Sequence, residues 1–256
     1  MRASVGVDVG GTKIAAAVVD AGGKIMLRDR CATPQGDAEV VLARVAAIVN
    51  DLVLQVEQSD IDIECVGVGV CGLVDASQSM VYVAPNLGWT GVSVRAHLQG
   101  ALNVPVIVEN DGAAAAWGEV IHGAGIGLRA IIMVTVGTGI GGGIVVDGRV
   151  LRGGHGVAAE IGHLNAVPDG RPCGCGSFGC WEQYGSGSAL LLEAREGAER
   201  RPDEATLLLS LGDGSPAGIV GSHVTDAARR GDVVALQALD RKSTRLNSSH
   251  QIISYA

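Results

Sequence analysis

The stretch SVGVDVGGTKIAAAVVD, residues 4–20, places small and branched apolar residues on either side of a glycine turn. Such runs bounded by glycine predict strands over residues 4–9 and 14–20. Between them, the glycines of DVGGTK (8–13) let the backbone approach an anion and turn its N–H groups toward it. Thr12 adds a hydroxyl and Lys13 a positive charge. Taken alone, this motif fits a phosphate-binding loop and an ordinary hairpin turn equally well.

The elements around this stretch predict an α/β domain. Asp37 is placed to cap a helix whose apolar residues recur every three or four positions from Val41 to Val56. The order of strands and helices is typical of α/β folds. The predicted elements are a third strand at 24–31, the helix after 37, strands at 66–70 and 104–108, and an alanine-rich helix at 112–120.

A second cycle of the same kind begins near residue 131. A strand at 131–136 leads into a glycine loop, GTGIGGG at 137–143, and a strand at 144–147 follows. Two strand–loop–strand units about 130 residues apart suggest two related lobes. Five glycines in seven residues exceed what a hairpin needs, which favours a phosphate-approach role over a structural turn. Helices are expected at 189–201 and 224–240.

Charge and composition exclude several classes of function. The 256 residues carry a formal net charge of −8, and only 3% are aromatic, which argues against a nucleic-acid partner. No apolar run approaches the roughly 20 residues that a membrane span needs, so no membrane role is expected. The N-terminus lacks the apolar core of a secretory signal, which favours a cytoplasmic location.

Glu109-Asn110-Asp111 stands at the expected end of a strand and the start of a helix. Ligands of open α/β sheets sit at the carboxyl ends of strands, and a carboxylate there could accept a hydroxyl proton. The alternative is that Asp111 simply caps the helix. On this motif alone the capping role is favoured.

Three thiols and one imidazole cluster late in the chain, at His163, Cys173, Cys175 and Cys180. This Cys₃His set is the composition of a closed, structural zinc site, although its spacing differs from that of zinc fingers. Glycines at 174, 176 and 179 would let the chain wrap round an ion. The alternatives are buried free thiols or a disulfide. A zinc ion there would anchor the neighbouring carboxylates of Glu160 and Glu182, where a polyol could meet them.

Together these motifs resemble the ROK family (repressors, open reading frames and sugar kinases), and within it the bacterial glucokinases. The resemblance runs from about Ser4 to Asp240, and CGCGSFGCWEQ at 173–183 is its most specific part. It implies a two-lobed ribonuclease-H-like fold of the actin and hexokinase type, closing over sugar and ATP. The lobes would be 1–118 and an incomplete 119–240. It also implies a homo-oligomer, a dimer or tetramer, when full length.

The resemblance further implies roles for individual residues. Asp111 corresponds to the catalytic base, and His163 would hold both sugar and zinc. The sugar ligands would be Asn86, Asn110, Asp111, Glu160, His163 and Glu182. The phosphate contacts would be Asp8, Gly10, Gly11, Thr12, Lys13, Gly137, Thr138 and Gly139.

The expected reaction is the ATP-dependent phosphorylation of glucose to glucose 6-phosphate, with Mg²⁺ and with a structural Zn²⁺. The motifs leave open a kinase for N-acetylmannosamine, N-acetylglucosamine or fructose, or a ROK-type sugar-sensing regulator without its DNA-binding domain. The phosphate loop begins at residue 8, which leaves no room for a preceding helix-turn-helix. A non-enzymatic zinc module would not explain two glycine loops.

The character of the chain changes at Arg241. RKSTRLNSSH, 241–250, is polar and basic and interrupts the apolar stripe of the preceding helix. The family continues here into further apolar helices and an adenosine loop. We therefore predict that 241–256 is a non-native tail, that the adenine pocket is incomplete, and that the 256-residue chain shows little or no kinase activity. The alternative is a genuine short variant with a flexible tail.

Overall fold

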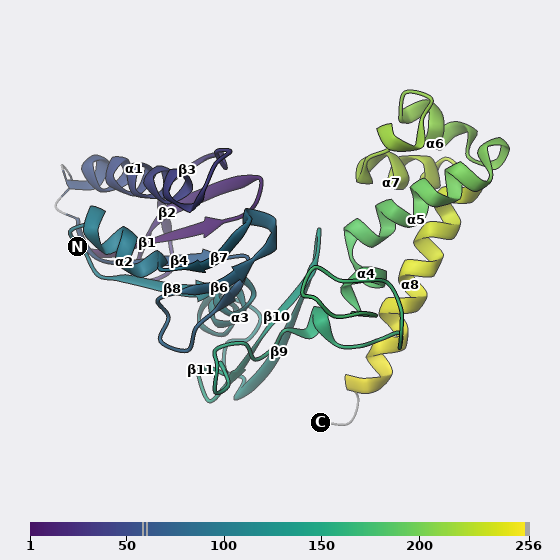
Figure 1. Ribbon diagram of the computed structural model, residues 1–256. Coiled ribbons are helices and arrows are strands. Elements are labelled where there is room, and N and C mark those ends of the chain that lie inside the picture. Colours follow the sequence, from purple (N-terminus) through teal and green to yellow (C-terminus); the bar gives the residue numbers. More distant parts are fainter. Residues whose placement is uncertain (58, 60, 254–256) are drawn as a thin grey trace. The chain divides into compact units, whose positions relative to one another are not determined.

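The computed structural model describes residues 1–57, 59 and 61–253 (Figure 1). Contacts divide the chain into two compact units. The first comprises residues 1–133 and 142–159, and the second comprises residues 134–141 and those from 160 onward. These units do not coincide with the lobes expected from the sequence, 1–118 and 119–240, and that division stays a prediction.

The first unit is built on a five-stranded sheet of order β3-β2-β1-β4-β8. β1, β2 and β3 pair antiparallel, whereas β4 and β8 extend the sheet in parallel with β1. All five strands expected from the sequence are present. Their bounds are β1 Arg2–Val9, β2 Lys13–Asp20, β3 Ile25–Ala32, β4 Asp62–Val70 and β8 Val106–Asn110.

Two helices cover one face of this sheet, α1 (Ala38–Glu57) and α2 (Val94–Ala101) (Figure 1). Alternate residues of β1 point into this core, where Val5, Val7 and Val9 are buried. The predicted helix start is confirmed, because the N–H of Val40 donates to the Asp37 carboxylate over 3.1 Å. Asp8 alternates with the buried valines of β1 and therefore lies on the other face of the sheet.

Helix α3 (Asp111–His122) follows β8 directly, and a small sheet of order β11-β10-β9 comes after it. The expected glycine loop at 137–143 is wrong in its second half, because β10 already begins at Ile140. Gly142 and Gly143 lie in β10 and pack against α3. A Cβ on Gly143 would lie 2.5 Å from that of Ala116. Part of the glycine excess thus serves close packing of strand on helix. The strands are β9 Ala130–Val136, β10 Ile140–Val146 and β11 Arg149–Val150.

A third sheet, of order β5-β6-β7, and a short 3₁₀ helix complete the first unit. The 3₁₀ helix carries Asn86 and ends at Gly88, whose φ of 67° is left-handed. Bounds are β5 Leu73–Val74, β6 Val81–Ala84, the 3₁₀ helix Pro85–Leu87 and β7 Trp89–Val92.

The second unit is mostly helical, with a core shared by α5, α6, α7 and α8. The single helix expected at 224–240 is wrong: α7 ends at Arg229 and Gly231, with φ 91°, turns the chain into α8. Buried Asp232 begins α8 by accepting the N–H of Ala235. Bounds are α4 Glu182–Gly185, α5 Gly187–Arg200, α6 Thr206–Leu211, α7 Gly221–Arg229 and α8 Val233–Ile253, with 3₁₀ helices at Ile161–His163, Pro202–Glu204 and Pro216–Gly218.

Helix α8 continues through Arg241 to Ile253, and the predicted interruption of its apolar stripe at Arg241 stays a prediction. That residues 241–256 are a non-native tail stays a prediction, part of which falls outside the described residues. Within the part of the chain that the structure describes, no helix is both long and apolar enough to cross a membrane.

Candidate functional site

The first glycine loop joins β1 to β2 in the first unit. The N–H of Gly10 donates to the carbonyl of Lys13 over 3.0 Å, and the Thr33 hydroxyl donates to the carbonyl of Gly10 over 2.6 Å. A Cβ on Gly11 would lie 2.5 Å from the carbonyl oxygen of Asn86. Glycine is therefore required for the loop to lie against Asn86. The side chains of Thr12 and Lys13 remain exposed to solvent.

The register of the sheet brings Asp8 and Asp111 to one region of the first unit. Asp8 pairs with Gly69 of β4, and Gly69 pairs with Glu109 of β8. A Cβ on Gly69 would lie 3.7 Å from the Cα of Asp111. Gly69, whose strand neighbours include Asp8, thus lies beside the backbone of Asp111. The structure thereby brings Asp8, Asn86, Asn110, Asp111 and the first glycine loop together in one unit.

Asn110, not Asp111, caps α3. The Asn110 side-chain oxygen accepts the N–H of Ala113 over 2.9 Å, and its amide donates to the carbonyl of Gly72 over 3.0 Å. The capping alternative for Asp111 is therefore wrong, since Asp111 is the first residue inside the helix. Asn110 retains one N–H and one lone pair for a ligand.

The surroundings of the Asp111 carboxyl shift its pKa. Although solvent reaches it, the protein around it partly desolvates the carboxyl and raises its pKa. The N–H of Gly112 acts in the opposite direction, and the negative charge of Asp8 raises the pKa further. Burial and the charge of Asp111 also raise the pKa of the neighbouring Cys71 to about 11. A carboxylate with a raised pKa is a better proton acceptor than an ordinary one.

Two residues outside the sequence motifs, Arg152 and Gln78, hold Glu109 at the end of β8. Arg152 donates through Nε and Nη2 to Glu109 Oε2, over 2.8 and 2.5 Å, and Gln78 donates to the same oxygen over 3.1 Å. Only 14% of the Glu109 side chain is exposed. This ion pair joins the chain just before Asn110 and Asp111 to the segment that leads to Glu160. No local spacing reveals it, because its partners are 43 residues apart.

We expect Arg152→Met to lower the free energy of unfolding by about 1–3 kcal/mol, because Glu109 would keep a largely buried charge without its cation. Urea unfolding measures this. Arg129→Met is the matched control, since Arg129 pairs with Asp147 at the surface, where 88% and 59% of the two side chains are exposed. That pair should be worth less than about 1 kcal/mol. Equal costs for the two variants would contradict the expectation.

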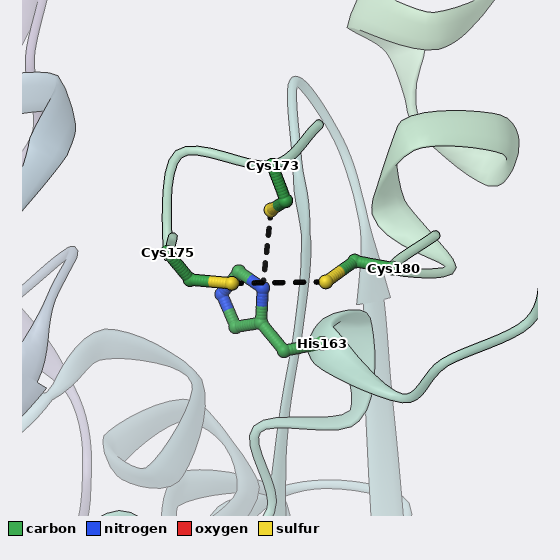
Figure 2. Close-up of side chains that lie close together, drawn as sticks. All are labelled: His163, Cys173, Cys175 and Cys180. Carbon is green, nitrogen blue, oxygen red and sulfur yellow. Dashed lines mark hydrogen bonds between the residues drawn. The ribbon is translucent and has the colours of Figure 1, made fainter. Parts of the chain in front are cut away.

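The four predicted metal ligands converge in the second unit. Figure 2 shows the side chains of His163, Cys173, Cys175 and Cys180 pointing toward one another. Their ligand atoms all lie within 4.8 Å of one another. The Cys175 and Cys180 sulfurs are 3.7 Å apart, and His163 Nδ1 lies 3.5 Å from the Cys173 sulfur. All six cysteines are free, so the disulfide alternative is not what the structure shows.

These spacings fit a zinc ion. Zn–S bonds of about 2.3 Å and Zn–N bonds of about 2.0–2.1 Å give tetrahedral edges of about 3.8 Å between sulfurs and about 3.6 Å between sulfur and nitrogen. The two measured pairs agree with these edges. Gln183 also donates to the Cys173 sulfur over 3.6 Å, as groups around a metal ligand commonly do.

Two of the three expected glycines shape this loop. Gly176, with φ 88°, closes a turn in which its N–H donates to the carbonyl of Cys173 over 3.0 Å. Gly179, with φ 72°, lies so close to the carbonyl of Val167 that no Cβ fits. Gly174 has open space around it, and its backbone does not require glycine.

The thiols differ in how readily they ionise. Burial, followed by hydrogen bonds that the Cys180 thiol donates to Cys175 and Cys173, raises the pKa of Cys180 to about 12. Burial also opposes ionisation of Cys175, but hydrogen bonds, led by the N–H of Ser177, lower its pKa. Crowded thiolates repel one another unless a cation compensates their charge.

The expected sugar ligands of the second unit lie beside this cluster. His163 Nε2 lies 4.0 Å from the Glu160 carboxylate, on the side of the ring away from Cys173. Glu182 follows Cys180 by two residues, and its Oε2 accepts the N–H of Ile140 over 2.8 Å. The loop Gly137–Gly139 therefore lies in the same unit as Glu160, His163 and Glu182.

Comparison with known proteins shows which family has this sequence. The chain matches the ROK family over residues 4–254. The chain belongs to the ROK family. It is 46% identical over 238 residues to a glucokinase of Streptomyces coelicolor, covering 93% of this chain and 73% of that one. It is 32% identical over 247 residues to an N-acetylmannosamine kinase of Yersinia pestis, covering 96% and 76%.

A solved structure of a ROK family relative is also similar. The glucokinase of Streptomyces griseus in complex with glucose and AMPPNP has a TM-score of 0.82 and 45% identity, covering 95% of this ROK chain and 76% of that one. The expected two-lobed α/β fold of the actin and hexokinase type is thereby confirmed.

Proposed function

We propose that the product of this ROK chain's complete gene transfers a phosphoryl group from ATP to the 6-hydroxyl of glucose. The observation that carries the proposal is the placement of Asp111. Its carboxylate is not used as the helix cap, its pKa is raised, and it shares its unit with the glycine loop at Gly10–Lys13. The likeness to a glucokinase solved with glucose and AMPPNP supports the choice of both substrates.

In the proposed reaction, Asp111 accepts the proton of the sugar hydroxyl as its oxygen forms a bond to the γ-phosphorus and the bond to ADP breaks. Positioning and neutralisation of charge are the main requirements of such a transfer. We assign phosphate binding to Gly10, Gly11, Thr12, Lys13 and the loop Gly137–Gly139, and a water-mediated Mg²⁺ contact to Asp8. Mg²⁺ would neutralise charge on the phosphates.

We assign the remaining sugar contacts to residues of both units. Asn86 and Asn110 in the first unit, and Glu160, His163 and Glu182 in the second, offer amide, carboxylate and imidazole groups for the other hydroxyls. We also propose one structural zinc held by His163, Cys173, Cys175 and Cys180, supported by their spacing. A dimer or tetramer stays a prediction.

A panel of sugars tests the substrate. We expect glucose to give the highest kcat/KM among glucose, N-acetylmannosamine, N-acetylglucosamine and fructose. A coupled assay of ADP release measures this, on the 256-residue chain and on the product of its complete gene in parallel. A higher kcat/KM for N-acetylmannosamine would favour the second candidate, for which the similarity to the Yersinia pestis kinase speaks.

A further inference from the structure

The backbone of Ile140 contacts both segments that carry the metal ligands: its N–H contacts Glu182, and its carbonyl contacts Gly162. This residue opens β10 directly after the loop Gly137–Gly139, and only 4% of it is exposed. Its N–H donates to Glu182 Oε2 over 2.8 Å. Its carbonyl lies against Gly162, so close that a Cβ on Gly162 would collide with the oxygen. Both contacts lie within the second unit.

The two residues that contact the Ile140 backbone, Gly162 and Glu182, lie within two residues of a metal ligand in the chain. Gly162 immediately precedes His163, and Glu182 follows Cys180 by two residues. The N–H of Trp181, between Cys180 and Glu182, donates to the carbonyl of Leu164 over 2.8 Å, which joins the two segments to each other. A metal ion that orders the Cys₃His cluster would therefore also order both residues that contact the Ile140 backbone.

The loop itself is held from its other side by the start of α5. The carbonyl of Gly137 accepts the N–H of Gly187 over 2.7 Å, and that of Thr138 accepts the N–H of Ser188 over 3.1 Å. Gly139 lies directly against the Glu182 carboxylate, where a Cβ would collide with Oε2. Residues 137–140 are thus each held by a contact. The start of α5 holds residues 137 and 138, and Glu182 contacts residues 139 and 140.

We propose that Glu182 is a positioning residue for the second glycine loop, and that the metal-binding loop sets the affinity for nucleotide phosphate through it. The proposal rests on the phosphate role assigned above to Gly137–Gly139. A carboxylate has two oxygens, so Oε2 holds Ile140 while Oε1 stays available to a sugar hydroxyl. One side chain thereby joins the metal cluster, the sugar and the phosphate loop.

Amide hydrogen exchange and nucleotide affinity test this proposal. We compare the zinc-loaded product of the complete gene with the same protein treated with a chelator, and measure exchange at residues 137–141. Losing one buried hydrogen bond of about 1–1.5 kcal/mol should speed exchange at Ile140 about tenfold. The amides of residues 10–13, in the other unit, are the internal control and should not change. Affinity for Mg²⁺-AMPPNP, measured by calorimetry without sugar, should fall about three- to tenfold.

Two variants separate this role from that of a sugar ligand. Glu182→Ala removes the acceptor for the Ile140 N–H, so it should speed exchange at Ile140 and weaken AMPPNP binding in the absence of sugar. Glu182→Gln keeps an acceptor oxygen, so exchange and AMPPNP affinity should remain near those of the parent. Rescue by Gln is expected only if the hydrogen bond to Ile140 is what matters.

The outcomes are distinguishable. Normal exchange at Ile140 in Glu182→Ala, with weaker glucose binding alone, would make Glu182 only a sugar ligand and overturn the proposal. Unchanged exchange at 137–141 after zinc removal would do the same. A parent protein that binds no AMPPNP would contradict the proposed function, while the exchange measurements would still decide whether Glu182 holds the loop.

Discussion

Asp111→Asn is expected to lower kcat by about 10²–10⁴ while leaving most of the glucose affinity intact. Asn can still hydrogen-bond the sugar hydroxyl but cannot take its proton, and removing a general base typically costs this much. The helix should survive the change, because Asn110 supplies the cap. Steady-state kinetics and calorimetry with glucose separate the two effects, in the product of the complete gene.

Asp147→Asn is the matched control, since Asp147 is exposed and Asn tolerates its left-handed backbone, φ 49°. A kcat near that of the parent in Asp111→Asn would reduce Asp111 to a sugar ligand. The pH profile offers a second check. Because the base must be ionised, and its pKa is raised, kcat/KM should fall with acid at a pH above the ordinary aspartate value of about 3.9.

The raised pKa of Asp111 affects stability in the opposite direction from activity: activity falls toward acid pH, whereas stability falls as the pH rises. The folded protein binds the Asp111 proton more tightly than the unfolded chain does, so ionising Asp111 lowers stability as the pH rises from its ordinary pKa through the raised one. At neutral pH the uncharged Asn should therefore be the more stable residue. Urea unfolding at neutral pH should show Asp111→Asn to be at least as stable as the parent.

Cys180→Ser is expected to remove the bound zinc and to destabilise the second unit. Cys180 is fully buried, and its sulfur is one of the four ligand atoms, three sulfurs and one nitrogen, that lie within 4.8 Å of one another. Binding at about 1,000 times Kd stabilises a folded state by about 4 kcal/mol, so a loss of that size is expected in zinc-containing buffer. Elemental analysis should fall from one zinc per chain to none, with a lower Tm.

Cys31→Ser is the control, because Cys31 lies on β3 in the other unit and contacts Arg44. It should leave the zinc content and Tm nearly unchanged. Glucose binding should weaken in Cys180→Ser but not in Cys31→Ser, since Glu160 and Glu182 adjoin the cluster. A metal-free parent protein that folds and melts normally would contradict the zinc assignment.

The positions of the strands along the chain and the Cys₃His set could be predicted because both depend on local sequence patterns. Val5, Val7 and Val9 alternate, which indicates one buried sheet face. The four metal ligands fall within 18 residues, so their types and spacing indicate the chemistry without knowledge of the fold. Where local signals compete, as at Gly231 between α7 and α8, the element bounds were missed.

The sequence by itself determined that this chain has an α/β fold, two glycine loops and a Cys₃His cluster. Only the tertiary structure decided which of two adjacent polar residues, Asn110 or Asp111, caps α3, because both types favour that position. It also decided that Gly143 packs on α3 and that Glu182 holds Ile140. Ile140 and Glu182 are 42 residues apart, and such pairs depend on how the chain folds back on itself, which no local pattern records.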